Sequence, residues 1–205
     1  MEKKWWSLLV IGVVFNIVLF LFDKPLIQFA SFFRVYLLDY FFISIAFASN
    51  VFVIFFFLTS LFLWKEHKRR WILPLWLTSL SAVLISFVIK NIVRRIRPFE
   101  GGMITVLGLG QYFLKGGFSF SFPSFQAVLV FSALPILDKE FPKFKYVWLG
   151  FAILVALSRV YFGLNYFSDV LAGAILGLLI GYVFIKIEDK YKIGRRVCKK
   201  LKLGK

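Results

Sequence analysis

The chain has 205 residues, of which 60% are apolar, 20% aromatic and 18% charged, and its net charge is +16. A soluble domain of this size usually has ~45–50% apolar and ~25% charged residues, so this composition excludes a disordered chain and argues against a water-soluble globular domain. A strongly basic soluble protein would suggest a nucleic-acid partner, but long uncharged stretches dominate here and we expect none. By its length the chain forms a single domain, 1–205.

Uncharged apolar stretches predict six membrane-spanning helices, at residues 5–22, 42–64, 71–89, 123–137, 146–162 and 168–187. The segment 25–39 contains Arg34 and Asp39, which make it too polar to span, so we expect an interfacial or short external helix there. The predicted fold class is an all-α polytopic membrane protein, a bundle of about six transmembrane helices.

Lysine and arginine counts predict the orientation of the bundle. If the N-terminus is inside, the cytoplasmic segments carry 18 basic residues and the opposite side carries 8, so we expect both termini in the cytoplasm. Residues 186–205 hold nine basic and two acidic side chains and are expected to form a basic cytoplasmic tail that binds anionic lipids. Gly173, Gly177 and Gly181 fall at four-residue spacing on the last predicted span, which allows another helix to approach closely.

A cluster of basic residues follows the third predicted span, in the sequence KNIVRRIRP at 90–98. The cluster opposes the charge rule, because it lies on the predicted non-cytoplasmic side. Lys90 and Arg97 are seven residues apart, so we expect them to share a helix face with Arg94 between them, and the helix to break just before Pro98. Guanidinium and ammonium groups suit phosphate oxygens, so the cluster is either a phosphate site or an ordinary basic membrane flank.

Two further segments open on the same predicted side. Ser124, after Pro123, has the position of a helix N-cap, where free N–H groups and the helix dipole attract anions; a plain cap is the alternative. Arg159 and Asp169 border apolar spans, where ionisable groups are costly unless they are paired or functional. They form either a structural ion pair or part of a site, and Asn165 shares a face with Asp169 if the sixth span has begun there.

The order of these segments resembles the signature of the type 2 phosphatidic acid phosphatase superfamily, whose motifs read KxxxxxxRP, PSGH and SRxxxxxHxxxD. The first motif is matched fully and the second by half, and the third is matched at the right spacing. The matching residues are Lys90, Arg97 and Pro98, then Pro123 and Ser124, then Ser158, Arg159 and Asp169. The resemblance covers about 90–182, with the motif region at 90–169.

The resemblance implies a lipid phosphate phosphatase that uses neither a metal nor another cofactor. The groups that would hold the phosphate are Lys90, Arg97, Ser124, the amide of Phe125 and Arg159, with Arg94 as a further candidate. It also implies a histidine nucleophile at the position of Asn165, a histidine general acid at that of Gln126, and Asp169 as the residue that orients the nucleophile. The site would face the periplasm or the cell exterior from the plasma membrane.

Polyprenyl diphosphates, phosphatidylglycerophosphate, phosphatidic acid and lipid A phosphates are the substrates that the resemblance implies. The chain departs from the family at both histidines, and Phe125 replaces the usual glycine. Its one histidine, His67, lies in KEHKRR on the opposite predicted side. An amide is neither a useful nucleophile nor a general base, so we predict a chain that binds a lipid phosphate but hydrolyses it poorly.

Two explanations of the missing histidines stay open. The replacements are either natural, in a non-catalytic lipid-phosphate binder or carrier, or engineered, to trap the substrate-bound state of an enzyme. The sequence predicts neither the particular lipid nor the oligomeric state.

Overall fold

The computed structural model describes residues 2–103 and 120–200, with side chains from residue 10 onward. All the regular structure in these residues is helical, which confirms the all-α prediction. In chain order the elements are α1 (Glu2–Ser31), α2 (Tyr36–Ala48), α3 (Val51–Leu63), the 3₁₀ helix η1 (Glu66–Trp71), α4 (Ile72–Val93), α6 (Phe125–Glu140), α7 (Phe144–Tyr161), α8 (Phe167–Tyr191) and α9 (Ile193–Lys200).

Within the described residues, four helical segments are long and apolar enough to cross a membrane, or five if α2 and α3 count as one bent span. The prediction of six spans included α6, which has only 16 residues. A straight helix needs ~20 residues to cross the hydrocarbon core, so the crossing by α6 stays a prediction.

The expectation of a separate helix at 25–39 is wrong, because α1 continues through Pro25 to Ser31. The polar groups that argued against a span have partners inside the protein: Arg34 donates from Nη2 to the carbonyl of Tyr161 (2.6 Å), and Asp39 accepts from the hydroxyl of Tyr161 (2.6 Å). Proline is tolerated in an apolar helix when neighbouring groups satisfy the backbone. The first helix is therefore longer than its uncharged stretch indicated.

The second predicted span is a bent pair of helices. α2 and α3 meet at an angle of 64° across residues 49–50. Asn50 caps the second helix, because its side chain accepts from the N–H of Phe52 (2.9 Å). A capping residue in the middle of an apolar run ends one helix and starts the next, which redirects the chain inside the predicted span.

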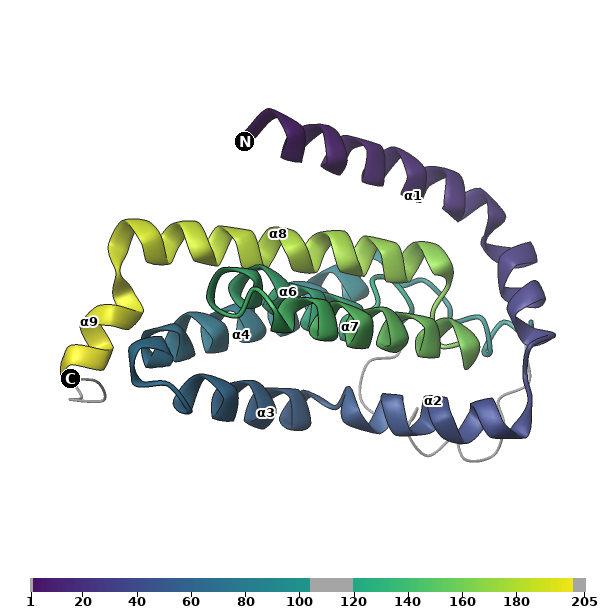
Figure 1. The fold of residues 1–205 in the computed structure, drawn as a ribbon. Helices are drawn as coiled ribbons and strands as arrows, with labels where there is room; N and C mark the ends of the chain where they lie inside the picture. The colour runs from purple at the N-terminus through teal and green to yellow at the C-terminus, as the bar shows by residue number, and fades with distance from the viewer. Residues whose placement is uncertain (1, 104–119, 201–205) are drawn as a thin grey trace.

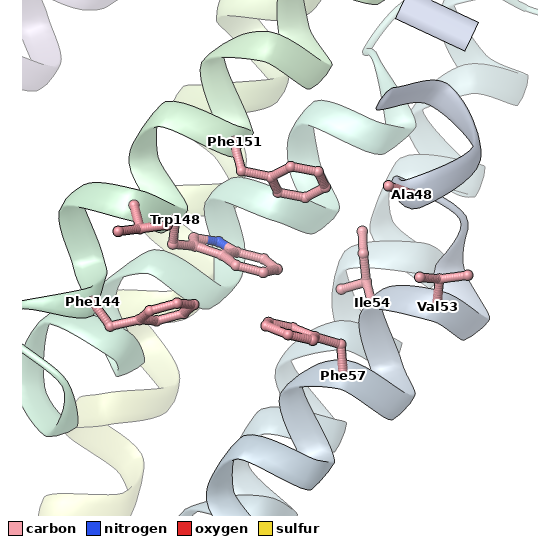
Figure 2. Close-up of a pocket in the computed structure, with 8 residues that line it drawn as sticks. Ala48, Val53, Ile54, Phe57, Phe144, Trp148 and Phe151 are labelled. Carbon is pink, nitrogen blue, oxygen red and sulfur yellow. The ribbon is translucent and has the colours of Figure 1, made fainter. Parts of the chain in front are cut away.

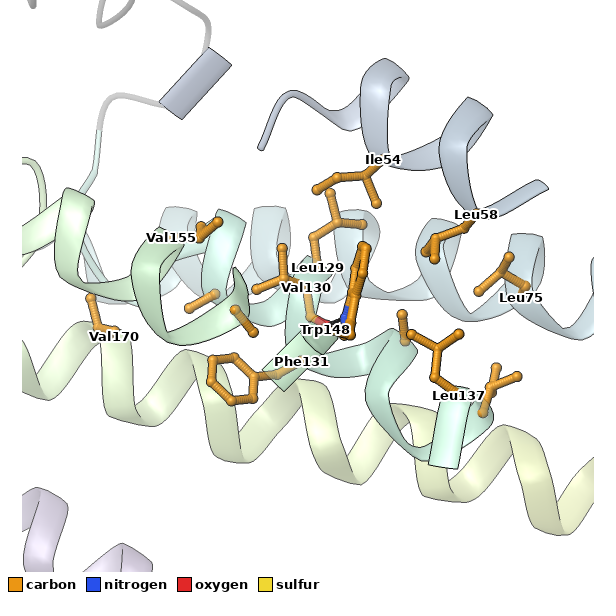
Figure 3. Close-up of a cluster of buried hydrophobic side chains, with 14 of the residues drawn as sticks. Ile54, Leu58, Leu75, Leu129, Val130, Phe131, Leu137, Trp148, Val155 and Val170 are labelled. Atoms are coloured by element: carbon orange, nitrogen blue, oxygen red, sulfur yellow. Dashed lines mark hydrogen bonds between the residues drawn. The ribbon is translucent and has the colours of Figure 1, made fainter. Parts of the chain in front are cut away.

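The centre of the bundle is α6, which α4, α7 and α8 surround (Figure 1). Ten of its 16 residues are buried, as expected for a helix that is apolar on all sides. Figure 3 shows the core around it, where the indole N–H of Trp148 on α7 donates to the carbonyl of Val130 (2.8 Å). This bond satisfies the one polar atom that the large ring carries into the core.

The predicted glycine face of α8 packs directly against α6. A Cβ atom at Gly177 would lie 2.4 Å from the carbonyl oxygen of Val128, and one at Gly181 would lie 2.2 Å from that of Ser132. Neither side chain would fit without moving a helix backbone. The four-residue glycine spacing therefore predicted the contact correctly, and this contact fixes the start of α8 beside the start of α6.

Candidate active site

The three segments that the sequence indicated meet at one end of the bundle, where α4 and α7 end and α6 and α8 begin (Figure 1). We call this region, formed by residues 90–99, 120–126 and 158–169, the site end. Their meeting follows from the alternating direction of successive helices, because each segment lies at a turn on the same side of the bundle.

Ser124 is the N-cap residue of α6, as predicted. Its N–H donates to the carbonyl of Asp169 (3.0 Å), which joins the start of α6 to the start of α8. Its side chain makes no capping bond, and Oγ is fully buried without a hydrogen-bond partner among the described residues. A buried hydroxyl without a partner costs about 1–3 kcal/mol, which a ligand oxygen at this helix N-terminus would offset.

α4 ends at Val93 rather than near Pro98, because Arg94 takes a left-handed conformation (φ 51°, ψ 36°). The prediction that Lys90, Arg94 and Arg97 share one helix face is therefore wrong. Arg94 is exposed, and its Nε donates to the carbonyl of Asn91 at its own helix end (2.9 Å). The left-handed residue turns the chain so that the residues after it follow a different direction from the helix.

Lys90 lies on the last turn of α4 and is only 2% exposed. Its Nζ donates to the backbone carbonyls of Phe120 (2.5 Å) and Ser121 (3.1 Å). Within the described part of the chain, no carboxylate forms an ion pair with it. A buried ammonium that has only neutral acceptors is costly, and an anion bound beside it would offset that cost.

Arg159 lies on the last turn of α7 and is 6% exposed. One guanidinium nitrogen, Nη2, donates to Oγ of Ser49 at the bend between α2 and α3 (2.8 Å). Its Nε is buried and has no partner among the described residues. The alternative of a structural Arg159–Asp169 pair is wrong within this part of the chain, because the ion-pair partner of Asp169 is Arg95 (2.6 Å).

Asp169 is a fully buried carboxylate in the first turn of α8. Oδ1 accepts from Arg95, while Oδ2 accepts from the N–H of Tyr166 (2.8 Å) and from the hydroxyl of Ser121. With Tyr166 it forms a capping box that starts the helix. Asp169 therefore holds the local structure of the site end together.

Asn165 is buried just before α8, which begins only at Phe167, so the condition for sharing a helix face with Asp169 is not met. Its Nδ2 donates to the carbonyl of Ser121 (2.6 Å). No hydrogen bond links it to Asp169 within the described residues. Gln126, the other position of a family histidine, is the second residue of α6 and is half-buried. His67 lies in η1, at the opposite end of α4.

Asp23 and Arg95 complete the site end, and the sequence reasoning missed both. Asp23 lies on α1, and its Oδ2 pairs with Nη2 of Arg95 (2.7 Å). Its Oδ1 accepts from the N–H of Ser168 (3.1 Å). Arg95 thus bridges two buried carboxylates, and its guanidinium lies 4.0 Å from the ring centre of Tyr166. Asp23 could have been found, because an ionisable residue inside an apolar helix is a site candidate, but the predicted first span stopped one residue before it.

Arg97 lies in the loop after α4, and its charge acts on both Lys90 and Arg159. Burial lowers the pKa of Arg97 from its ordinary value, and the nearby carboxylates of Glu100 and Asp169 offset only part of this fall. A guanidinium remains protonated at neutral pH after such a shift. Arg97 therefore adds a positive charge to a region that already holds two buried cations.

The charges of the site end do not balance. Its buried and half-buried charged residues, within the described chain, are the cations Lys90, Arg95, Arg97 and Arg159 and the carboxylates Asp23 and Asp169. The excess of two positive charges suits a phosphate group, which carries about −1.5 to −2 at neutral pH. The geometry is that of a helical membrane bundle with a buried cationic site.

Residues 71–192 match the family model described as the PAP2 superfamily, and these residues make up more than half of the chain. The chain belongs to the PAP2 superfamily, the family of type 2 phosphatidic acid phosphatases, and the resemblance is confirmed. Its apolar helices and this membership make it a multi-pass membrane protein.

Two relatives whose names state an activity are similar in sequence. The chain is 31% identical over 134 residues to an undecaprenyl-diphosphatase of Sulfolobus acidocaldarius, a match that covers 64% of this chain and 62% of that protein. It is 32% identical over 121 residues to phosphatidylglycerophosphatase B of Bacillus subtilis, covering 53% of this chain and 54% of that one. Each match therefore spans less than two thirds of the relative.

Two solved structures share the fold. A transmembrane PAP2-type phosphatidylglycerolphosphate phosphatase from Bacillus subtilis superposes with a TM-score of 0.70 at 22% identity, covering 90% of this chain and 98% of that one. Aquifex aeolicus LpxE superposes with a TM-score of 0.65 at 23% identity, covering 80% and 95%. At these identities the likeness establishes the helical arrangement.

Proposed function

We propose that this chain binds the phosphate or diphosphate of a membrane lipid at the site end, and that hydrolysis there is strongly impaired in the sequence as it stands. The observation that carries the proposal is a pair of buried polar atoms, Ser124 Oγ and Arg159 Nε, that have no hydrogen-bond partner among the residues that the structure describes. They come from two different helices and from two of the three family motifs. Phosphate oxygens accept hydrogen bonds from both kinds of donor, and the bond from a guanidinium is charge-assisted.

The lipid class follows from the family and from the names of the relatives. An undecaprenyl-diphosphatase and a phosphatidylglycerophosphatase are both named for lipid phosphates. A ligand that partitions into the bilayer also fits a chain with several apolar helices. Polyprenyl diphosphates, phosphatidylglycerophosphate, phosphatidic acid and lipid A phosphates are the candidates to test.

The groups at the two catalytic positions argue against efficient hydrolysis. In the family reaction a histidine attacks phosphorus and a second histidine protonates the leaving oxygen. The side-chain nitrogen of Asn165 is an amide nitrogen, whose lone pair is delocalised into the carbonyl group, so it is not a nucleophile; its N–H donates to the carbonyl of Ser121. Gln126 has no proton to give at neutral pH. Loss of a covalent catalyst lowers turnover by roughly 10⁴- to 10⁶-fold in enzymes where it has been dissected.

The phosphate-holding groups remain, and they can act without the histidines. Lys90, Arg97 and Arg159 would neutralise the phosphate oxygens, while the start of α6 would supply N–H donors. These are binding contacts, and they form whether or not a covalent step follows. The chain would thus keep affinity for the phosphate while losing most of the reaction.

The second candidate function is a non-catalytic lipid-phosphate binder or translocator. One observation favours it: both oxygens of Asp169 are occupied by bonds within the fold, to Arg95, Ser121 and Tyr166. A carboxylate that accepts three bonds from the fold has one acceptor position left of about four, so it serves the structure first and the orientation of a group at position 165 second. The site would then serve binding alone.

The proposed orientation places the site on the non-cytoplasmic face of the plasma membrane, with the basic segment after residue 186 against anionic lipids. Two observations support it. The end of α8 and α9 lie at the end of the bundle opposite the site end, and α1 runs from above α8 towards the site end (Figure 1). The basic residues of η1 and α9 also gather there, as the positive-inside rule expects for cytoplasmic segments.

The test of the proposed function compares phosphate release by the chain with release by the double variant Gln126→His, Asn165→His, using a panel of lipid phosphates in detergent. We expect turnover in the double variant and little in the chain itself. Adding Arg159→Ala to the double variant should abolish the gained activity, which controls for contaminating phosphatase.

Equal and rapid release by the unchanged chain would overturn the claim of impairment. If neither protein releases phosphate while both bind lipid phosphate in a way that Arg159→Ala removes, the site is a binding site and the enzyme is excluded. If neither protein binds or releases phosphate, the proposed function is wrong.

A further inference from the structure

A cavity of about 300 Å³ lies between α3 and α7, beside the bend that joins α2 to α3 (Figure 2). Its lining is entirely apolar and includes Ala48 at the end of α2, Val53 and Phe57 on α3, and Trp148 and Phe151 on α7. Figure 2 shows the side chains of the two helices facing each other across the opening. Trp148 is buried at the floor of the cavity, whereas Phe57 at its rim is 46% exposed. The cavity therefore opens on the outer surface of the bundle.

The bend creates this cavity. Before the bend, α2 packs on the end of α7, where the rings of Phe42 and Tyr161 are 4.6 Å apart. After the 64° turn, α3 faces α7 across the cavity, where the rings of Phe57 and Trp148 are parallel with their centres 6.1 Å apart. The cavity therefore begins at the bend and extends between α3 and α7.

One end of the cavity adjoins a residue that contacts the site end. Ser49, at the bend, accepts the hydrogen bond from Arg159, and the residue before it, Ala48, lines the cavity. Phe151 precedes Arg159 by eight residues on the same helix, a distance of about 12 Å along the axis. A molecule whose charged group lies against Arg159 therefore needs a chain of about 12 Å to place an apolar group in the cavity.

We infer that the cavity binds one hydrocarbon chain of the lipid whose phosphate is held by Arg159, Lys90 and Ser124. The inference rests on the proposed function and adds the apolar half of the ligand to it. Two features identify the occupant. The lining has no group that would recognise a polar ligand, and the volume is at the lower limit of ligand pockets, about 300–1,000 Å³, which suits one chain.

The experiment measures equilibrium binding of dodecyl phosphate, butyl phosphate and inorganic phosphate to the full chain in detergent micelles. The variant Val53→Trp adds bulk at the cavity wall without touching the phosphate groups. Val183→Trp is its matched control, because Val183 is an exposed residue of α8 that does not line the cavity. The control reports how a new tryptophan alters partition of the probe into the micelle.

We expect the chain to bind dodecyl phosphate at least tenfold more tightly than butyl phosphate. Val53→Trp should remove roughly tenfold of that advantage, as expected when several methylene groups lose their apolar site. Butyl phosphate and inorganic phosphate should bind Val53→Trp as they bind the unchanged chain, and Val183→Trp should change no affinity. If both tryptophan variants weaken dodecyl phosphate equally or neither does, the cavity is not the chain site and the inference is wrong.

The outcome also separates this inference from the proposed function. Tight binding of all three probes that Arg159→Ala removes, combined with insensitivity to Val53→Trp, keeps the phosphate site and rejects the cavity. No binding of any phosphate rejects both.

A photoreactive dodecyl phosphate, with a diazirine at the end of its chain, gives a second measurement that needs no folded variant. Adducts on Phe57, Trp148 or Phe151 support the inference. Adducts found only on exposed residues of other helices, such as Leu179 on α8, overturn it.

Discussion

The two ends of the bundle use the same residue types in opposite ways. At the end opposite the site, formed by residues 65–71, 138–145 and 186–200 and called here the tail end, three of the four ion pairs among the described residues have an exposed carboxylate; Glu140, which pairs with Arg70, is the exception. Lys139 lies 2.5 Å from Asp189, and that aspartate is 56% exposed. At the site end, Arg95 pairs with Asp23 and Asp169, both of which are buried.

Burial decides what these charges can do. An exposed pair adds little to stability, because water and salt screen it. A buried charge must be matched by a partner or a ligand. Each buried cation at the site end without an anionic partner among the described residues therefore indicates a ligand of opposite charge. Lys90 and the Nε of Arg159 are such groups, and the account of a lipid-phosphate site depends on them.

The largest expected effect concerns Arg95. The change Arg95→Met leaves Asp23 and Asp169 buried without their cation, and we expect the free energy of unfolding to fall by about 3–5 kcal/mol. Unfolding in detergent, followed by circular dichroism, measures this loss. The same change at the exposed Arg196 of the tail end is the control and should lower the free energy by at most about 0.5 kcal/mol. Equal losses at the two ends would remove the distinction between them.

The next effect is on binding. Arg159→Gln removes a charge-assisted donor, a change of about 1.5–3 kcal/mol, so affinity for a lipid phosphate should fall roughly 10- to 100-fold. Titration of a fluorescent lipid phosphate in detergent measures the change, and Arg196→Gln provides a control of equal charge. An unchanged affinity in Arg159→Gln would mean that the buried guanidinium has a purely structural role.

Ser124→Ala should separate binding from stability. Because Ser124 Oγ has no partner in the described part of the chain, its removal should leave the free energy of unfolding unchanged or raise it by about 1 kcal/mol. Affinity for the lipid phosphate should nevertheless fall by roughly threefold to tenfold.

A matched control for Ser124→Ala exists on the same helix. Ser132 is also buried, but its hydroxyl donates to the carbonyl of Leu129 (2.8 Å). Ser132→Ala should therefore lower stability slightly and leave binding unchanged. If Ser124→Ala destabilises the protein as much as Ser132→Ala does, without weakening binding, Ser124 is a plain structural residue.

The smallest expected effect is at the tail end. Lys139→Ala breaks the exposed pair with Asp189, and we expect the free energy of unfolding to change by about 0–1 kcal/mol. At about 1 M salt the difference from the unchanged chain should disappear, because the Debye length falls to about 3 Å. Denaturant titrations at low and high salt check this, and a loss above about 2 kcal/mol would show that the tail end is not a screened surface.

Local patterns in the sequence predicted much of this architecture. The apolar stretches located α7 and α8, and the glycine spacing identified the face that packs on α6. The three motifs predicted that Lys90, Ser124 and Arg159 lie at one end of the bundle, because each motif lies at a helix end. These features depend on residues that are close together in the chain, which is why the sequence predicted them.

The failures came from interactions between distant residues and from single backbone conformations. Asp23 joins the site from α1, more than 140 positions before its partner Ser168, and no local pattern records that contact. Arg94 was chosen over Arg95 because the spacing assumed a continuous helix, whereas one left-handed residue reverses which arginine is buried. The bend at residues 49–50 divides a long uncharged run, so neither the bend nor the cavity beside it was predicted from hydropathy.

The central claim is that the chain binds a lipid phosphate and leaves it intact. The most direct measurement is prolonged incubation of the unchanged chain with a saturating lipid phosphate, followed by ³¹P NMR of both the bound lipid and the released phosphate. The account predicts a saturable, stoichiometric lipid signal that is shifted from free lipid, with essentially all the phosphorus still esterified. Repeated turnover to inorganic phosphate, or the absence of any saturable bound signal, would contradict it.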